Sequence, residues 1–201
     1  MNANTAALAI GAALGGGFFA GYIRVGDGLD ALIISPKAAG ERALAVWHSS
    51  RKSITGAQSF FNGHANTLAM AEAGSDLAKW AIDLCIADFS DWFLPSRDEL
   101  ELLYRNFKPS SNENYASFRD GDNPSSVPAG YPYTSTFPAQ TALYTCRTGG
   151  ADAFEEAWYI SSTEYAPDPA CAWYQIFAGG YQNAYLKDDS YRARAVRRQP
   201  V

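Results

Sequence analysis

Residues 92–100 of the chain are Trp-Phe-Leu-Pro-Ser-Arg-Asp-Glu-Leu. In this stretch Ser96 is followed three residues later by Glu99, which is the spacing of a capping box at the start of a helix. Apolar residues then recur on one helical face. They are Leu100, Leu103 and Tyr104. The stretch therefore predicts a helix that begins at about Arg97 and ends at about Asn106.

The residues before this helix predict a hairpin and a first, longer helix. Phe18–Val25 and Ala31–Ser35 have strand patterns, and the intervening Gly-Asp-Gly at 26–28 is typical of a tight turn. Leu44–His48 indicates a third strand. Ala65–Ala87 has apolar residues near helical spacing, so we expect one helix there.

The residues after the helix predict a long irregular insert and then strands. Residues 108–157 show no periodicity and hold five prolines, so we expect an ordered but irregular insert there. From Trp158 onward the pattern is β, with a turn at Gly179-Gly180. The expected strands are Trp158–Ser162, Ala172–Phe177, Tyr181–Lys187 and Tyr191–Arg198.

Composition favours one domain rich in sheet and ordered loops. The chain has 201 residues, of which 47% are hydrophobic, 14% aromatic and only 18% charged. Its formal net charge of −5 argues against nucleic acid as a partner. Arg192, Arg194, Arg197 and Arg198 could meet phosphate or sulfate groups, but we interpret them as ion-paired, with Asp188 and Asp189 as partners.

The first residues are expected to form a separate segment. The apolar run Ala6–Leu14 is too short to cross a bilayer, which needs about 20 residues. No Lys or Arg precedes Arg24, which argues against a secretory signal peptide. The alternative is that the protein is exported. We therefore divide the chain into an N-terminal segment at 1–16, which could dock or assemble, and a single domain at 17–201.

Neither a metal site nor a cofactor is expected. The three cysteines are not in a Cys-x-x-Cys motif, and the chain has only two histidines. Asp120-Gly121-Asp122-Asn123 offers several oxygen ligands, so calcium is an alternative there, but such clusters are usually plain turns.

Four blocks of sequence resemble a known family. They are Trp-Phe-Leu-Pro-Ser-Arg-Asp-Glu-Leu (92–100), Trp-Tyr-Ile-Ser-Ser-Thr-Glu-Tyr (158–165), Ala-Trp-Tyr-Gln-Ile-Phe-Ala-Gly-Gly-Tyr-Gln (172–182) and Arg-Ala-Arg-Ala-Val-Arg-Arg (192–198). In this order they resemble the C-type-lectin-like domains of phage and prophage tail proteins and of bacterial adhesins. Relatives of that family include formylglycine-generating enzymes and retroelement-diversified phage receptor-binding proteins. The resemblance implies an α+β fold, with two helices flanking a small twisted antiparallel sheet and long loops that contact ligand.

The C-terminal hairpin is the predicted binding surface. Side chains alternate between the two faces of a strand, and a surface of Tyr, Asn and Gln suits adaptable recognition of sugars or proteins. The alternative is that these aromatic side chains only cover the sheet. Trp158, in the strand before the hairpin, is expected to pack in the core. The candidate ligand-binding residues are Tyr165, Asp168, Tyr174, Gln175, Tyr181, Asn183, Tyr185 and Asp188.

These patterns predict a non-enzymatic receptor-binding protein of a phage tail tip or tail fibre. Its expected partners are a host-surface glycan or protein, other tail proteins and further copies of itself, most simply as a trimer. It would be made in the host cytoplasm and reside in the virion, or else be a prophage-encoded cytoplasmic or exported protein. One alternative is a structural virion protein whose aromatic surface is a subunit interface. The other is a formylglycine-generating type of enzyme, for which Cys146 and Cys171 would be the reactive pair.

Overall fold

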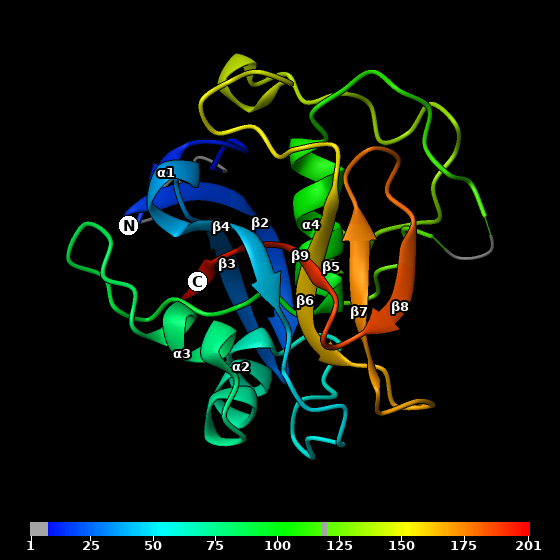
Figure 1. The fold of residues 1–201 in the computed structure, drawn as a ribbon. Helices are drawn as coiled ribbons and strands as arrows, with labels where there is room; N and C mark the ends of the chain where they lie inside the picture. Colours follow the sequence, from blue (N-terminus) through cyan, green and yellow to red (C-terminus); the bar gives the residue numbers. More distant parts are fainter. Residues whose placement is uncertain (1–7, 118–119) are drawn as a thin grey trace.

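Two curled sheets lie side by side, with few helices around them (Figure 1). A computed structural model of the chain describes residues 8–117 and 120–201. The first sheet has the order β1-β2-β3-β10, with β5 paired to β2, and the second has the order β4-β9-β6-β7-β8. Neighbouring strands are antiparallel except β6 and β9, which pair in parallel. This mixed architecture agrees with the predicted α+β class.

The strands are β1 (Ala13–Leu14), β2 (Gly17–Val25), β3 (Gly28–Ile34), β4 (Glu41–Val46), β5 (Ser126–Val127), β6 (Trp158–Glu164), β7 (Cys171–Ile176), β8 (Gln182–Leu186), β9 (Ser190–Arg194) and β10 (Val196–Pro200). The helices are α1 (Lys37–Gly40), α2 (Gly63–Glu72), α3 (Asp76–Ile82) and α4 (Arg97–Phe107), with a 3-10 turn η1 at Tyr144–Cys146. Among the residues that the structure describes, no helix has the length and apolar character that a membrane span requires.

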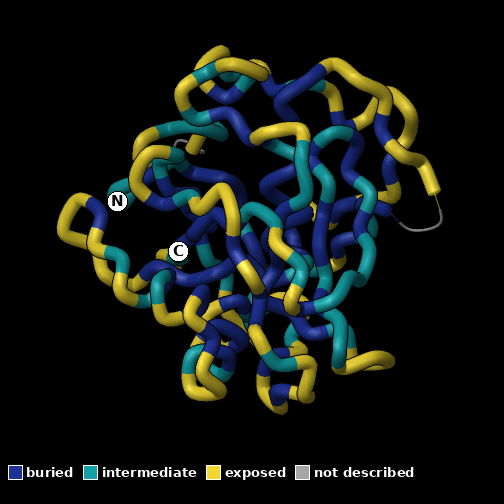
Figure 2. Tube along the Cα trace, viewed as in Figure 1, coloured by how far each residue is buried: buried dark blue, intermediate teal, exposed yellow. Residues whose placement is uncertain are grey.

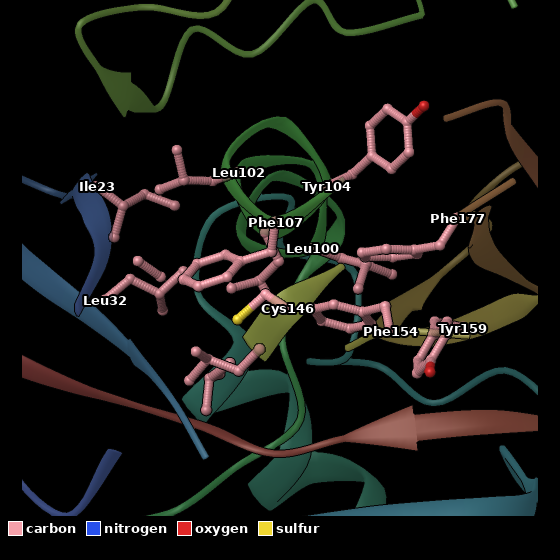
Figure 3. Close-up of a cluster of buried hydrophobic side chains, with 14 of the residues drawn as sticks. Ile23, Leu32, Leu100, Leu102, Tyr104, Phe107, Cys146, Phe154, Tyr159 and Phe177 are labelled. Carbon is pink, nitrogen blue, oxygen red and sulfur yellow. The ribbon is translucent and has the colours of Figure 1, made fainter. Parts of the chain in front are cut away.

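The helix α4 begins where the capping box predicts. The Ser96 side chain accepts a hydrogen bond from the Glu99 N–H, and the Glu99 carboxylate accepts one from the Ser96 N–H at 2.7 Å. α4 then buries nearly all of its length against both sheets. Figure 3 shows Leu100, Tyr104 and Phe107 of α4 between residues of the first sheet and residues near the second. The helix therefore holds the two sheets in one core.

The predicted long helix at 65–87 is wrong, because the structure has two short helices there. Gly74 lies between them with a φ of +103°, a left-handed conformation that ends α2. Ser75 then caps α3 by accepting a hydrogen bond from the Ala78 N–H. The fold thus has more than the two predicted helices, and α2 and α3 lie together at the lower left of the molecule in Figure 1.

The predicted single last strand at 191–198 is also wrong, because this stretch contains two strands that belong to different sheets. β9 pairs with β4 and β6 in the second sheet, whereas β10 pairs with β3 in the first. Ala195 separates them, and its N–H and C=O bond to Gly40 and Ser35 rather than to either sheet. The predicted single small sheet is therefore corrected to two sheets that are joined by this short crossing.

The irregular stretch 108–157 arches over one end of the molecule (Figure 1). Figure 2 shows that its described part alternates between buried and exposed residues, so it packs on the domain while keeping an open side. Buried polar side chains anchor it, including Asn114, which bonds Tyr104 of α4 at 2.6 Å.

The N-terminal segment is partly joined to the first sheet. Residues 13–14 form β1 against β2, and the Phe19 N–H donates to the Ala12 carbonyl at 2.8 Å. Residues 1–7 lie outside the described residues. The proposed docking or assembly role of residues 1–16 stays a prediction.

Candidate functional site

Four aromatic rings form a connected cluster on one face of the second sheet, and we call this cluster the aromatic face. Trp158 lies 4.8 Å from Tyr185 and 6.1 Å from Tyr181, and Tyr185 lies 5.8 Å from Tyr191, all between ring centroids. All four residues are partly exposed. They come from β6, β9 and the β7–β8 hairpin, so the sheet itself holds the rings in place.

The β7–β8 register explains why the hairpin residues gather there. Tyr174 pairs with Asn183 across the two strands, and Ala172 pairs with Tyr185. Because side chains alternate along a strand, Tyr181, Asn183 and Tyr185 share the face that carries Trp158. Asn183 is partly exposed on this face, and its Oδ1 accepts a hydrogen bond from the Ala184 N–H at 2.8 Å. The three predicted residues of the return strand are thus brought together.

Two predicted contact residues are buried, which corrects the sequence-based surface. Tyr174 is 1% exposed and belongs to the core beneath the aromatic face, where its hydroxyl donates to the Leu186 carbonyl at 3.1 Å. Gln175 is 0% exposed on the other face of β7, and its amide donates to Tyr133 and Gly180. Both side chains are covered at their own positions on β7, so neither can contact a ligand without rearrangement of the core.

The other three predicted residues lie in turns outside the aromatic face. Tyr165 packs its ring edge-to-face on Trp173 at 5.2 Å. Asp168 is exposed, but its carboxylate accepts a hydrogen bond from the Ala170 N–H within its own turn. Asp188 forms an exposed ion pair with Arg51 at 2.9 Å. Whether these three contact a ligand stays a prediction.

The chemistry of the aromatic face is that of neutral rings and hydrogen-bonding groups. Burial, Asp189 and Tyr185 together raise the pKa of Tyr191 above its usual value of 10.0. Its phenol therefore stays protonated at neutral pH and keeps an O–H donor. Rings of this kind contact apolar C–H surfaces, while phenol and amide groups hydrogen-bond at the edges.

Trp158 and Tyr191 are the residues that sequence reasoning missed. Trp158 packs against the core with part of its ring, as expected, but it stays partly exposed. Tyr191 was interpreted only as the start of a strand. The sequence did show that Tyr191 begins a strand that follows a Tyr-rich hairpin. Its position beside Tyr185, however, depends on the pairing of β6 with β9, which the sequence does not reveal.

The four C-terminal arginines are paired within the chain, which confirms their interpretation as structural. The predicted partners are wrong, because Asp188 instead binds Arg51 and the arginines reach residues far away in sequence. Their partners are Glu41 for Arg192, the Ser35 carbonyl for Arg194, Asp91 for Arg197, and Asn62 with Asp30 for Arg198.

The segment Asp120–Asn123 is tied into the loop by its own side chains. The Asp120 carboxylate accepts hydrogen bonds from the Gln182 N–H and from Ser117. The buried Asn123 amide donates to Glu101 at 2.7 Å. Among residues 8–117 and 120–201, no group of three or more His, Cys, Asp or Glu side chains is placed to hold a metal ion. Calcium binding at this segment stays an untested alternative.

Comparison with known protein families gives a match over most of the chain. Residues 41–197 match the model of the family described as the Lcl C-terminal domain, which is more than half of the chain. The matched stretch contains the first three of the four sequence blocks and all but the last residue of the fourth. No curated protein matches the chain. The resemblance drawn from these blocks is therefore confirmed at the level of the family.

Proposed function

Because the chain belongs to the Lcl C-terminal domain family, a family of C-type-lectin-like domains of phage and bacterial tail proteins, we propose that it is a receptor-binding domain. It recognises a glycan or a protein on the host-cell surface, and it does so through the aromatic face. The family match favours a tail or adhesin-like role. We also assign the two sheets, the flanking helices and the long irregular stretch to the C-type-lectin-like fold.

The observation that carries the proposal is the aromatic face itself. Its rings are fixed by packing against one another and against the core, so little conformational entropy is lost when a ligand contacts them. Large aromatic side chains dominate the energetics of recognition surfaces. A rigid, partly exposed group of rings with an adjacent amide therefore suits binding of a sugar face or of an apolar protein patch.

The proposal places the protein in the virion, at a tail tip or tail fibre. Its further partners are other tail proteins and copies of itself, with a trimer as the expected assembly. Residues 1–16 would serve as the docking or assembly arm.

The proposal assigns recognition and no catalysis. The two cysteines that a formylglycine-generating enzyme would use have different surroundings. Cys146 lies in the core, where burial raises its thiol pKa above 9.0, while Cys171 lies in a strand, where burial and Asp168 raise its thiol pKa. Raised thiol pKa values leave little thiolate at neutral pH, which does not favour nucleophilic chemistry.

A double variant tests the binding surface. Tyr181→Ala with Tyr185→Ala removes two rings from the aromatic face and leaves the buried Tyr174 in place. We expect the affinity of the labelled protein for intact cells of susceptible strains to fall about ten-fold or more, because such rings are typical hot spots. Flow cytometry over a panel of candidate host strains measures the dissociation constant.

The matched control is Tyr131→Ala with Tyr144→Ala. These two tyrosines are 75% and 80% exposed in the irregular stretch, outside the aromatic face, so this variant should bind cells as the wild type does. Unchanged binding by the Tyr181/Tyr185 variant would show that the aromatic face is the wrong surface. No cell binding by assembled wild-type protein would instead favour the structural virion role, in which the same rings lie between subunits.

A further inference from the structure

The chain's own cations lie over aromatic rings elsewhere on the molecule but not on the aromatic face. Arg97 lies over Phe60 and Trp173, at 5.1 and 4.9 Å from the ring centres, and Arg147 lies 4.3 Å from the centre of the Tyr144 ring. Among the residues that the structure describes, no Lys or Arg lies over any of the four rings of the aromatic face. Because the faces of aromatic rings attract cations, these partly exposed rings can accept a cation from another molecule.

The two cations next to the aromatic face in sequence are held by carboxylates elsewhere. Lys187 follows the last residue of β8, but it is buried in an ion pair with Glu164 at 2.6 Å. Arg192 follows Tyr191 in β9, so its side chain points to the opposite face of the strand. There it bonds Glu41 at 2.9 Å. Neither cation can therefore serve the rings.

A carboxylate without a matching cation borders the aromatic face beside Tyr191. Burial and then the negative charge of Asp189 raise the pKa of Tyr191, which places this carboxylate close to the ring. The neighbouring cation Arg51 is held by Asp188 through two hydrogen bonds of 2.9 Å. In the described part of the chain, no Lys or Arg forms an ion pair with Asp189, which is partly exposed. The charge that complements this border is positive.

The packing of the rings favours a flat cation over a compact one. Trp158 and Tyr185 lie 4.8 Å apart, and Tyr185 and Tyr191 lie 5.8 Å apart, so the rings contact one another and leave no room between them to enclose an ammonium group. A guanidinium group is planar, stacks on ring faces and presents several N–H donors that match a carboxylate. It could therefore lie on the rings and still reach Asp189. An anionic ligand would be repelled by Asp189, and a neutral one would gain nothing from it.

From this arrangement we propose that the aromatic face binds an arginine-bearing segment of a protein. Arginine side chains of the partner stack on Trp158, Tyr185 and Tyr191, and one of them pairs with Asp189. The inference rests on the proposed receptor-binding function for the origin of the partner, and it names a basic polypeptide rather than a glycan as the ligand of the same surface.

The test is an NMR titration of isotope-labelled wild-type protein with synthetic peptides of equal length. The probe consists of repeated Arg-Gly-Ser units, and in the comparison peptides Lys, Gln or Glu replaces each Arg. We expect saturable shifts at millimolar or lower concentrations of the arginine peptide, centred on the Trp158 indole and the Asn183 amide. The lysine peptide should bind more weakly, and the glutamine and glutamate peptides should not saturate. Salt at about 0.5 M should weaken binding of the arginine peptide, because it screens exposed charges.

Variants assign the binding to the aromatic face. Tyr185→Ala removes a ring and should weaken binding of the arginine peptide about five-fold. Asp189→Asn removes the bordering charge and should weaken it about three-fold. The matched control is Asp76→Asn in α3, which changes the net charge equally at a side chain that is 98% exposed and outside the aromatic face. It should bind the peptide as the wild type does.

Three results of the titration would overturn the inference. They are no saturable shift with the arginine peptide, equal binding of the glutamine peptide, and full binding by both Tyr185→Ala and Asp189→Asn. Equal weakening by Asp76→Asn and Asp189→Asn would show attraction by net charge alone, which also contradicts a site on the aromatic face.

Cell binding separates this inference from the receptor-binding function. Trypsin treatment of host cells, which cleaves surface proteins after Lys and Arg, should remove binding of the wild-type protein. Periodate treatment, which oxidises sugar diols, should leave it. The reverse result would overturn the inference and leave a receptor-binding protein whose ligand is a glycan. Peptide binding at the aromatic face without any cell binding would support the inference and contradict the receptor-binding function.

Discussion

Replacement of Lys187 by methionine is expected to lower the free energy of unfolding by about 3–5 kcal/mol, because it leaves a buried carboxylate without its cation. Lys187 and Glu164 form an ion pair at 2.6 Å, and both side chains are 0% exposed. The Lys187 ammonium also donates to the Lys52 carbonyl at 2.9 Å and lies 4.5 Å from the centre of the Trp47 ring.

Glu164 accepts hydrogen bonds from three further donors, all in the loop before α2. The ion pair therefore also stabilises that loop. The carboxylate accepts hydrogen bonds from the Ser53 hydroxyl, the Gln58 amide and the Ile54 N–H, at 2.8, 2.8 and 2.6 Å. Loss of Lys187 would therefore destabilise the loop as well as the ion pair. Urea unfolding followed by circular dichroism measures the change.

The matched control is Arg51→Met, which breaks the exposed ion pair with Asp188. Exposed pairs contribute little because water and salt screen them, so this variant should unfold close to the wild type. If Lys187→Met also unfolded close to the wild type, the buried pair would not stabilise the fold as described.

The ion pair between Lys187 and Glu164 should also affect how the free energy of unfolding depends on pH. Burial alone would raise the pKa of Glu164, but hydrogen bonds from Lys187, Gln58 and Ile54 outweigh it and hold the pKa below 4.5. A carboxylate with a lowered folded pKa adds stability above its unfolded pKa and loses it as the pH falls through the folded value. The wild type should therefore lose this contribution below about pH 4.5, and Lys187→Met should show less of that loss.

Replacement of Arg194 by methionine has the second largest expected effect, a loss of about 3 kcal/mol in the free energy of unfolding. The Arg194 side chain is 1% exposed and donates twice to the Ser35 carbonyl, at 3.1 and 2.8 Å, and once to the Asp152 carbonyl at 2.7 Å. It thus ties together the end of β3, the end of the irregular stretch and β9. Methionine keeps much of the apolar contact with Phe154 but leaves these acceptors unpaired.

Arg192→Met is the comparison for this site. Arg192 lies two residues earlier on the same strand and bonds Glu41 at 2.9 Å, but its side chain is 27% exposed. After this substitution Glu41, which is 5% exposed, keeps Arg194 at 4.0 Å, so the loss should be about 1 kcal/mol and smaller than that of Arg194→Met. Equal effects of the two substitutions in thermal and urea unfolding would contradict the role given to Arg194.

Local signals predicted the local parts of this fold. The capping box at Ser96 and Glu99 depends on residues three positions apart, so the start of α4 could be predicted from the sequence. The β2–β3 hairpin was predicted for the same reason, since Gly26 adopts a φ of +60° in the turn. By contrast, the helical pattern over 65–87 continues across Gly74, and only the backbone shows that it breaks there.

Contacts between distant segments could not be predicted. The strand pattern of residues 191–198 does not reveal the crossing at Ala195, because the crossing depends on bonds to Ser35 and Gly40. The sequence predicted that Tyr174 and Gln175 point to opposite faces of their strand. It did not predict that both are buried, because their burial also depends on distant segments. Tyr174 is covered by packing from distant parts of the chain, and Gln175 by Tyr133 of the irregular stretch.

A pocket of about 390 Å³ between the start of α4 and the β7–β8 hairpin shows the same limit more strongly. Its walls come from Phe60, Arg97, Asp120, Trp173 and Gln182, which no motif joins. The aromatic face was partly predictable because Tyr181, Asn183 and Tyr185 alternate within one short strand pattern, whereas Trp158 and Tyr191 reach it through the pairing of β6 and β9.

The most direct test of recognition through the aromatic face is tyrosine labelling of the wild-type protein, free and bound to intact host cells. Iodination followed by peptide mass spectrometry reports each tyrosine separately. Tyr181 and Tyr185 should label in the free protein and be protected on cells, while Tyr131 and Tyr144, at 75% and 80% exposure, should label in both states. Equal labelling of Tyr181 and Tyr185 in cell-bound and free protein would contradict recognition through the aromatic face.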